Sequence, residues 1–291
     1  MRFEFIEDHR EEFPVIRMCK VLDVSRSGYY AWRGRPPSER EMANRELYEK
    51  IKAVYDEGKE MYGSPRIYDV LTARGVVCSE NRIARLMRLR GLRAKQEETF
   101  KVTTRRNEMH PVAPNLLKRN FEAERPNEKW LTDITYIRTE EGWLYLAVVL
   151  DLYSRRIVGW AMSERMTTDL TIRAVMMALA HREVAPGLIH HSDQGSQYTD
   201  SRYQQLLKDW GIKPSMNGVG TWYDNAPVES FFATLKTERV HHCIYRTRQD
   251  ARADIFSYIE GFYNRRRIHT SLGSLSPLTY EQLYHRGAAI P

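Results

Sequence analysis

Three acidic residues that stand far apart in the sequence could together do chemistry. Asp133 lies inside a β-rich run, Asp193 follows a short apolar run, and Glu229 stands at the start of an expected helix. A lone carboxylate inside a central strand is costly to bury, and a divalent cation that takes oxygen ligands is a suitable partner for it. If the fold gathers the three acids, the sequence predicts a site for a divalent cation.

Each acid also has a structural interpretation. An Asp shortly before a Gly-Ser pair, such as Asp193, is commonly a turn residue. A Glu in a first helical turn, such as Glu229, interacts favourably with the helix dipole. The three acids support a functional site only jointly, because all of them fall where the expected topology would make them converge.

The elements that must position these acids begin at Trp130, where the sequence becomes rich in β-branched and aromatic residues. Strands are expected at residues 130–138, 143–152, 157–162, 187–192 and 212–216, and helices at 168–182, 200–210, 227–238 and 248–263. Three meandering strands followed by alternating helices and strands imply a mixed five-stranded sheet flanked by helices. The predicted fold class is therefore α/β, with the ribonuclease-H-like order of elements.

The helix that carries Glu229 shows which way its side chains point. Its apolar residues recur at helical spacing and should face the core: Val228, Phe231, Phe232 and Leu235. At 100° per residue, Glu229 and Lys236 share a stripe about a quarter-turn from that face. Glu229 can therefore lean toward the sheet, and Lys236 can point the same way toward a phosphate.

The N-terminal part of the chain reads as helical and basic. Two short helices are expected within residues 14–33, a longer one at 39–55, and another from Ser64 to Gly75. Ser79 then caps a helix at 80–90 that carries three arginines on one side, namely Arg82, Arg85 and Arg88. A helix, a short turn and an arginine-bearing helix form the helix-turn-helix pattern of DNA-binding proteins. The alternative is that these arginines form an ordinary solvated helix face.

The distribution of charge supports a polyanionic partner. The 291-residue chain has a formal charge of +7, and residues 1–120 hold 25 Lys and Arg against 18 Asp and Glu, while residues 121–291 hold 20 of each. All of the net charge thus lies in front of the strand-rich part, which suggests DNA binding in front and chemistry behind. Three scattered cysteines, no signal-peptide core and no apolar run of membrane-spanning length lead us to expect a cytoplasmic protein without a membrane partner.

These patterns predict five segments. They are a short helical N-terminal segment (1–38), a basic all-α helix-turn-helix region (39–95), a basic linker (96–126), the ribonuclease-H-like core (127–240) and a C-terminal helical extension of the core (241–291).

Several sequence blocks resemble one family. They are Thr132-Asp133-Ile134-Thr135-Tyr136-Ile137, Asp151-Leu152-Tyr153-Ser154-Arg155-Arg156, His191-Ser192-Asp193-Gln194-Gly195-Ser196, Asp224-Asn225-Ala226-Pro227-Val228-Glu229 and Tyr263-Asn264-Arg265-Arg266-Arg267. In this order they resemble the integrase catalytic core of insertion-sequence transposases, namely the OrfB product of the insertion-sequence-three family, which is similar to retroviral integrases. The 35 residues between Asp193 and Glu229 match the family's D(35)E spacing.

The resemblance implies a DNA transposase of the DDE type that uses two Mg²⁺ or Mn²⁺ ions. Asp133 and Asp193 would be the principal ligands, and Glu229 would complete the site and orient the nucleophile. Water would first free a 3′-OH at the element end, and that 3′-OH would then attack target DNA. The implied partners are the element ends, target DNA, an upstream-frame product or fusion, and further copies of the chain.

Other residues are expected near the site or on DNA. Asn225 is a candidate for metal-site support and Lys236 for phosphate contact, with lower expectations for His191, Gln194 and His269. Asp151 is interpreted as structural. DNA contacts are expected from Arg266 and Arg267 as well as from the arginines of the helix-turn-helix, which should make binding strongly salt-dependent.

Two alternatives remain open. A ribonuclease-H-like nuclease with the same acids would hydrolyse DNA without joining it, and a DNA-binding partial product would regulate the complete transposase without catalysis. A phosphatase-like hydrolase of small molecules fits the basic N-terminal region poorly.

Overall fold

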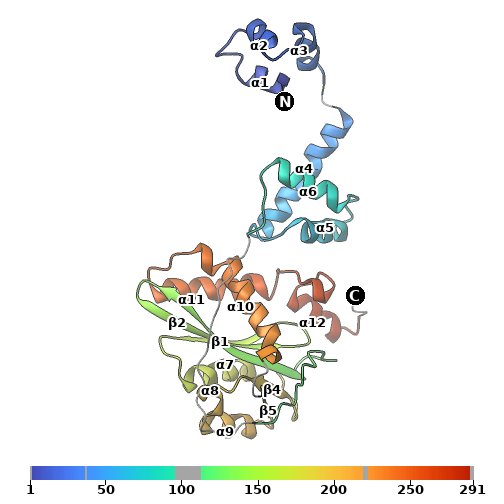
Figure 1. Cartoon of the computed structure of the whole chain (residues 1–291). Helices are drawn as coiled ribbons and strands as arrows, with labels where there is room; N and C mark the ends of the chain where they lie inside the picture. The colour runs from blue at the N-terminus through green and yellow to red at the C-terminus, as the bar shows by residue number, and fades with distance from the viewer. Residues whose placement is uncertain (1, 37, 96–112, 219–221, 289–291) are drawn as a thin grey trace. The chain divides into compact units, whose positions relative to one another are not determined.

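A mixed five-stranded sheet with the order β3-β2-β1-β4-β5 forms the centre of the C-terminal unit of the computed structural model (Figure 1). The strands are β1 (Lys129–Thr139), β2 (Gly142–Asp151), β3 (Ile157–Ser163), β4 (Ile189–Ser192) and β5 (Lys213–Met216). The first three strands pair antiparallel, whereas β4 is parallel to β1 and β5 is parallel to β4. The predicted fold class is confirmed.

The structure describes residues 2–36, 38–95, 113–218 and 222–288. They fall into two compact units, residues 1–53 and 54–291, and the boundary lies within helix α4 (Glu39–Glu57). The described residues include no helix that combines the length and the apolar character needed to cross a bilayer.

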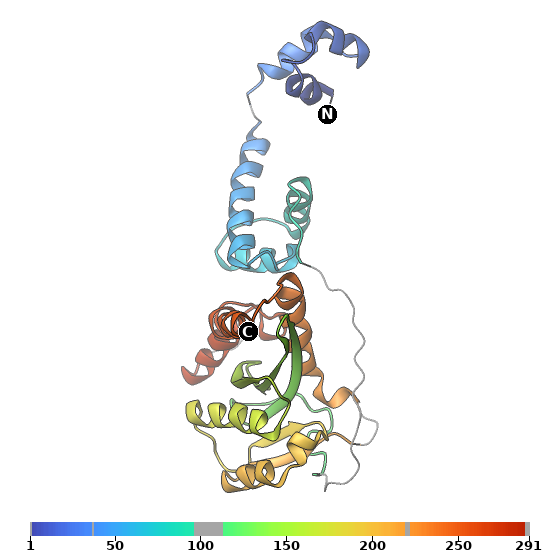
Figure 2. The same ribbon diagram turned by 90° about the vertical axis from the view of Figure 1, so that its left-hand side faces the viewer.

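Helices cover both faces of the sheet, as Figure 2 shows. One face packs on α7 (Thr168–His181) and α9 (Ser201–Asp209), with the short α8 (Ser196–Thr199) before α9. The other face carries α10 (Ala226–Glu238) and α11 (Arg248–Phe256), which continues as a π-helix through Ser257–Tyr263. The remaining elements are the 3-10 turns Trp222–Asn225, Val240–His242 and Thr270–Leu272, and the C-terminal helix α12 (Pro277–His285), which the sequence analysis did not predict.

The core lies on both faces of β2, which explains why this strand reads as an almost continuous apolar run. Alternate residues of β1 and β2, among them Trp130 and Ala147, pack with Ala174 and Ala178 of α7. Gly159 on β3 lies so close to the Ala174 carbonyl that an added Cβ would collide with it. This close approach requires glycine at position 159 and holds α7 tightly on the sheet.

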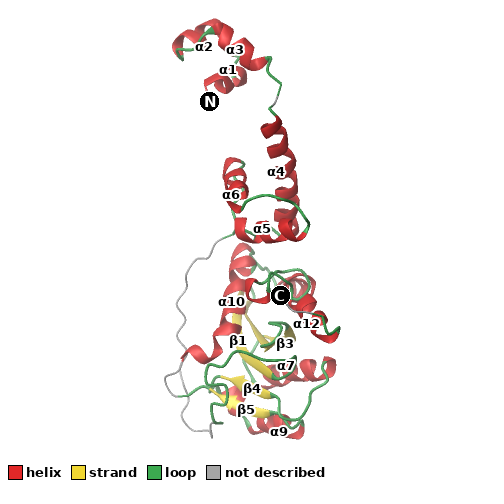
Figure 3. Ribbon diagram, turned by 90° about the vertical axis from the view of Figure 1, so that its right-hand side faces the viewer, coloured by secondary structure: helices red, strands yellow, loops and turns green. Residues whose placement is uncertain are grey.

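The second unit begins with the end of α4, followed by α5 (Ser64–Ala73) and α6 (Glu80–Leu89), which are helices in Figure 3. Gly75 ends the α5 segment with a φ of 77°, and the Ser79 side chain accepts a hydrogen bond from the Arg82 N–H at the start of α6. The buried residues of these helices are Val54, Tyr55, Ile67, Leu71, Ile83, Leu86 and Met87. The predicted α5 and α6 therefore form.

The first unit contains α1 (Arg2–Asp8), α2 (Val15–Val21) and α3 (Arg26–Arg33). The sequence predicted α2 and α3 but not α1. The three helices share one apolar cluster, centred on Ile6, Met18, Cys19 and Tyr29.

The predicted basic linker lies only partly within the described residues, because residues 96–112 fall outside them. Its last part lies against the sheet. Leu117 is buried, the Leu116 N–H donates to the Ser215 hydroxyl at 2.9 Å, and the Lys129 ammonium donates to the Glu122 carbonyl at 2.5 Å. Residues 113–126 thus pack on the core.

Candidate active site

Asp133 lies in the part of β1 that extends beyond β4. The pairing with β4 covers only Lys129–Leu131, whereas β2 accompanies β1 along its whole length. Trp130 and Ile134 contribute to the core that α7 covers, so the alternation of side chains turns Asp133 toward the face that carries α10. The short β4 therefore leaves Asp133 accessible at an open edge of the sheet.

The electrostatic surroundings of Asp133 disfavour a lone negative charge. Burial, followed by the charges of Asp193 and Glu229, raises the pKa of Asp133 to about 8. The Ile134 N–H, which donates to the carboxylate at 2.7 Å, and the Lys236 ammonium act in the opposite direction. Without a bound cation, these surroundings favour the protonated form of Asp133.

Asp193 directly follows the end of β4, where parallel strands open toward the C-terminal edge of the sheet. The Gly195 N–H donates to its carboxylate at 2.9 Å, so Asp193 also makes the turn contact that its sequence context suggests. Burial raises the pKa of Asp193, and the Gly195 N–H partly offsets that effect. The turn contact uses one side of the carboxylate and does not remove its charge from the neighbourhood of Asp133.

Glu229 stands exposed in the first turn of α10. The apolar residues predicted to face the core are indeed buried: Val228, Phe231, Phe232 and Leu235. They dock α10 on β1, which brings Glu229 close enough for its charge to act on Asp133. Although the residue is exposed, the neighbouring protein removes part of the water around its carboxylate, and this desolvation raises the pKa of Glu229.

The three predicted acids thus come from separate elements and at least two of them act electrostatically on the third. All three carboxyl groups have raised pKa values: burial raises those of Asp193 and Glu229, and at Asp133 the charges of the other two acids add to the effect of burial. No group of three or more His, Cys, Asp or Glu residues in the described parts of the chain is arranged closely enough to hold a metal ion. The charges of Asp193 and Glu229 therefore act on Asp133, but the three carboxylates do not form a complete set of metal ligands.

Lys236 adds a cation to the same place. Its half-buried ammonium lies 4.8 Å from the centre of the Tyr136 ring, within the range of a cation–π contact. Burial lowers the pKa of Lys236, and the charge of Asp133 raises it. The sequence analysis predicted Lys236 but missed Tyr136, although that residue stands only three positions after Asp133 in the same strand.

Asn225 holds the start of α10 against β1. Its side-chain amide donates to the Thr132 carbonyl at 3.3 Å, and its Oδ1 atom is buried without a hydrogen-bond partner. The preceding Asp224 accepts a hydrogen bond from the Asn115 amide at 2.7 Å and pairs with Arg119 at 3.5 Å. The Asn225 Oδ1 atom is thus a buried oxygen without a partner, next to Thr132, which precedes Asp133. Such an oxygen can bind a hard cation or accept a hydrogen bond from the water bound to it.

Comparison with known proteins decides the family. Models named "Integrase core domain" match residues 123–221 and 229–283, and an "HTH-like domain" model matches residues 42–99. An uncharacterised 31 kDa protein of insertion element IS600 from Shigella sonnei is 45% identical over 94% of this chain and 100% of its own length. The transposase InsF of insertion sequence IS3A from Escherichia coli K12 is 44% identical over 97% of this chain and 98% of its own length.

The chain belongs to the IS3 family of insertion-sequence transposases. Among solved structures, the catalytic core of HTLV-2 integrase in complex with magnesium is similar, with a TM-score of 0.44 and 16% identity over 55% of this chain and 99% of that one. A likeness this distant says nothing about individual residues.

Two other predicted site residues of this transposase, Gln194 and His191, are sequence neighbours of Asp193. Gln194 donates to the Asn217 carbonyl at 2.5 Å. His191 is buried, contacts the Ser215 hydroxyl at 2.8 Å and the Asn217 amide oxygen at 2.5 Å, and has a pKa lowered by burial. Both side chains connect the end of β4 to the end of β5.

His269 and Asp151 do not join the acids. His269 packs edge-on against Tyr263 and lies 3.3 Å from the Arg267 guanidinium, and burial with nearby arginines lowers its pKa to about 3. Asp151 is fully buried and accepts hydrogen bonds from the backbone of Asn127, Tyr153 and Ser154. These contacts agree with the structural interpretation of Asp151.

The arginines predicted to contact DNA differ in availability. Arg85 and Arg88 on α6 and Arg266 are exposed, and Arg82 is half-buried. Arg267 is only 5% exposed, and its guanidinium forms a two-pronged pair with the buried Glu238, with contacts of 2.7–2.9 Å. The predicted DNA contact of Arg267 does not fit this burial, because its donors are already taken inside the protein.

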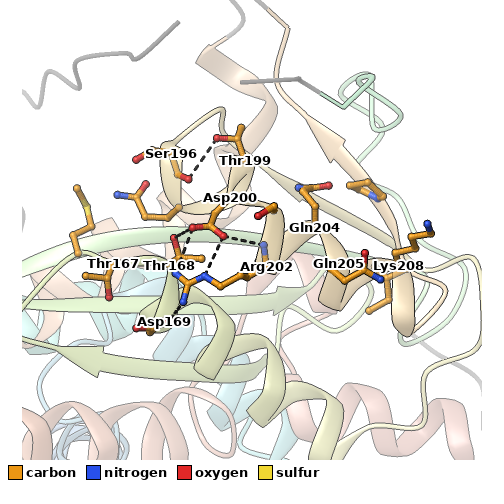
Figure 4. A pocket seen from close by; sticks show the side chains of 15 residues that line it. Thr167, Thr168, Asp169, Ser196, Thr199, Asp200, Arg202, Gln204, Gln205 and Lys208 are labelled. Carbon is orange, nitrogen blue, oxygen red and sulfur yellow. Dashed lines mark hydrogen bonds and ion pairs between the residues drawn. The ribbon is translucent and has the colours of Figure 1, made fainter. Parts of the chain in front are cut away.

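An open pocket of about 1060 Å³ lies between the start of α7, α8 and α9 (Figure 4). Inside it, Asp200 accepts hydrogen bonds from Thr168 and Arg202, and Arg202 also pairs with Asp169. None of the three predicted acids lines this pocket. This hollow is therefore separate from the place where the predicted acids lie.

Proposed function

We propose that this transposase hydrolyses phosphodiesters at the ends of its element and joins the freed 3′-OH to target DNA, with Asp133, Asp193 and Glu229 as the catalytic, metal-binding acids. The observation that carries the proposal is the repulsive field at Asp133, whose pKa of about 8 reflects burial beside two further carboxylates. Carboxyl groups with strongly perturbed pKa values cluster at functional sites, and here three of them come from separate elements.

The residues present fit a divalent cation. Two aspartates, a glutamate and the unpaired Asn225 Oδ1 atom offer hard oxygen donors, which suit Mg²⁺ or Mn²⁺. When bound, two such ions would stabilise the attacking and leaving oxygens of an in-line displacement. Glu229 is exposed on the first turn of α10, and its side chain would have to turn toward Asp133 and Asp193 to complete the donor set.

The other side chains would orient the DNA. Lys236, held over the Tyr136 ring, would neutralise a phosphate next to Asp133. Glu229 would accept a hydrogen bond from the attacking water and orient it toward the phosphorus atom. The buried contact of Asn225 with Thr132 would keep α10, and with it Glu229 and Lys236, aligned along β1.

We further propose that residues 39–95 bind DNA through Arg82, Arg85 and Arg88, and that 127–240 form the catalytic core with 241–291 as its helical extension. Arg266 would add a phosphate contact next to the core. The active form would be an assembly of several copies that also requires an upstream-frame product or fusion. Segment 96–126 would link the DNA-binding region to the catalytic core.

The decisive experiment supplies the purified chain with a labelled duplex that ends in the element's terminal sequence, a target plasmid and Mg²⁺. We expect nicked ends with a free 3′-OH and joined products, both lost in Asp193→Asn. Asp209→Asn is the matched control, because Asp209 is an exposed acid of the same domain that contacts only Gln205 in its own helix. Nicking without joining would favour the hydrolytic nuclease. Binding without any cleavage, also in the presence of the upstream-frame product, would favour the regulatory protein.

A further inference from the structure

The first unit of the chain contains a helix pair whose connection is unusually well defined. Only four residues, 22–25, separate α2 from α3. Asp23 adopts a left-handed conformation with a φ of 51°, its N–H donates to the Lys20 carbonyl, and the Val24 N–H donates to the Cys19 carbonyl at 3.0 Å. This is a Schellman ending of α2, and the Ser25 side chain at once caps α3 by accepting the Gly28 N–H at 3.0 Å.

The two helices are held at a set angle by a small core. Met18 and Cys19 of α2 and Tyr29 of α3 are buried against Ile6 of α1, and Trp32 packs at the margin of this cluster. Gly28 allows a close approach, since an added Cβ would lie 2.7 Å from the Ser25 hydroxyl and 3.3 Å from the Phe3 ring. A short turn and a buried aromatic residue on the second helix are what a helix-turn-helix requires.

The packing leaves the opposite face of α3 in solvent. Arg26, Ser27, Tyr30 and Arg33 are exposed, and the Arg26 guanidinium lies 5.7 Å from the centre of the Tyr30 ring. Serine, tyrosine and arginine are the side chains that hydrogen-bond phosphates and base edges. The exposed face of α3 therefore has the composition of a recognition helix.

The distribution of charge within this unit also favours DNA binding by the helix pair α2–α3. Residues 14–36 carry five basic side chains and one acid, whereas residues 2–13 carry two basic side chains and five acids. Glu7 of α1 pairs with Arg10 at 2.7 Å and with Arg33 at 3.4 Å, and it accepts the Tyr29 hydroxyl hydrogen bond. Most acids of residues 2–36 thus lie in α1 or shortly after it, and most basic side chains lie in the helix pair and its flanks, where Arg33 pairs with Glu7.

A comparison with the second helix pair of the chain strengthens this interpretation. The connection between α5 and α6 has six residues, 74–79, and also contains a left-handed residue, Gly75, followed by a Val76 N–H donating to the Leu71 carbonyl at 2.9 Å. The same ending therefore occurs in both pairs, and the N-terminal connection is the shorter one. The HTH-like family model begins at residue 42 and leaves α1–α3 unassigned.

We propose that α1–α3 form a second, independent DNA-binding helix-turn-helix, with α3 entering the major groove of a DNA duplex and Arg26, Ser27 and Tyr30 facing the bases and phosphates. This module goes beyond the catalytic proposal, because it needs neither the acids nor a metal. The sequence analysis predicted only a short helical segment at residues 1–38, without a function. Together with the helix-turn-helix that contains α6, it would give one chain two DNA-binding elements.

The test measures binding of the full chain to a duplex of the element end and to a scrambled duplex of equal length, in EDTA and at several salt concentrations. Arg26→Ala is expected to weaken binding to the element end on the order of tenfold. If Arg26 touches a phosphate, the slope of log K against log salt also falls by about 0.9. Arg2→Ala, which removes an exposed arginine from α1 of the same unit, should leave affinity within about twofold.

Each outcome decides the matter. Equal affinity of Arg26→Ala and the parent, or equal weakening by Arg26→Ala and Arg2→Ala, would overturn the proposal. A change in oligomeric state with unchanged DNA affinity would assign the α3 face to a protein partner and also overturn it. Ser27→Cys, tested for disulfide cross-linking to a thiol-bearing base in the duplex, gives a second readout that does not depend on affinity. Because EDTA prevents metal-dependent chemistry, these results are independent of the Asp193→Asn cleavage test.

Discussion

The replacement Asp133→Asn should stabilise the metal-free protein at alkaline pH while abolishing its chemistry. Asp133 has a pKa of about 8 in the fold against 3.8 in a model peptide, so the folded state binds a proton more tightly than the unfolded state. Folding stability therefore falls as pH rises from about 4 to about 8, and it levels off above. Asparagine cannot ionise and escapes this loss.

The magnitude follows from the two pKa values. At about 1.4 kcal/mol for each pH unit, a change from 3.8 to about 8 corresponds to an upper limit of roughly 6 kcal/mol. Asp133 is only half-buried, so water screens part of the repulsion, and we expect about 2–3 kcal/mol at pH 8.5. For a unit of this size, that raises the midpoint of thermal unfolding by roughly 4–12 °C.

Scanning calorimetry in EDTA between pH 5 and 8.5 measures this difference in the midpoint of thermal unfolding. The advantage of Asp133→Asn should shrink steadily toward pH 5. Added Mg²⁺ should raise the midpoint of the parent at pH 8 and leave the variant almost unchanged, since metal and proton compete for the same carboxylate. If the unfolding midpoints of parent and variant changed with pH in parallel, the reasoning would be refuted, because ionisation of Asp133 would then not destabilise the fold.

Three further results are expected. Lys236→Gln removes the cation that lowers the pKa of Asp133, so the rise of cleavage rate with pH should move to higher pH and the rate at pH 7 should fall about 10–100-fold, as measured on labelled element ends. Arg267→Ala removes the two-pronged partner of the buried Glu238, which then keeps only the Tyr258 hydroxyl at 2.6 Å and Arg66 at 3.6 Å, and it should cost about 3–5 kcal/mol in urea unfolding. Arg266→Ala, at an exposed neighbour, should cost under about 1 kcal/mol. Gly159→Ala forces α7 away from β3 and should cost at least about 1–3 kcal/mol; an unchanged unfolding midpoint would contradict the close approach.

Local patterns were sufficient for much of the fold. The strands, α7 and α10 could be predicted because the spacing of apolar residues records which face of an element is buried, and β2, buried on both faces, shows a continuous apolar run. The same argument placed Glu229 and Lys236 beside the stripe that packs on β1. The acids could be proposed because Asp133, Asp193 and Glu229 all stand where a ribonuclease-H-like topology turns side chains toward one edge.

Other features depended on contacts between distant residues, which periodicity does not contain. Whether Arg267 would reach DNA or Glu238 was decided by where residues 238 and 267 meet, and the neighbouring Arg266 with the same sequence context stayed exposed. The ring under Lys236, the packing of residues 113–126 on the core and the support of α3 by α1 were likewise set by tertiary structure. A charge or an aromatic ring has no fixed partner until the chain folds, because burial and distance determine both its energy and its role.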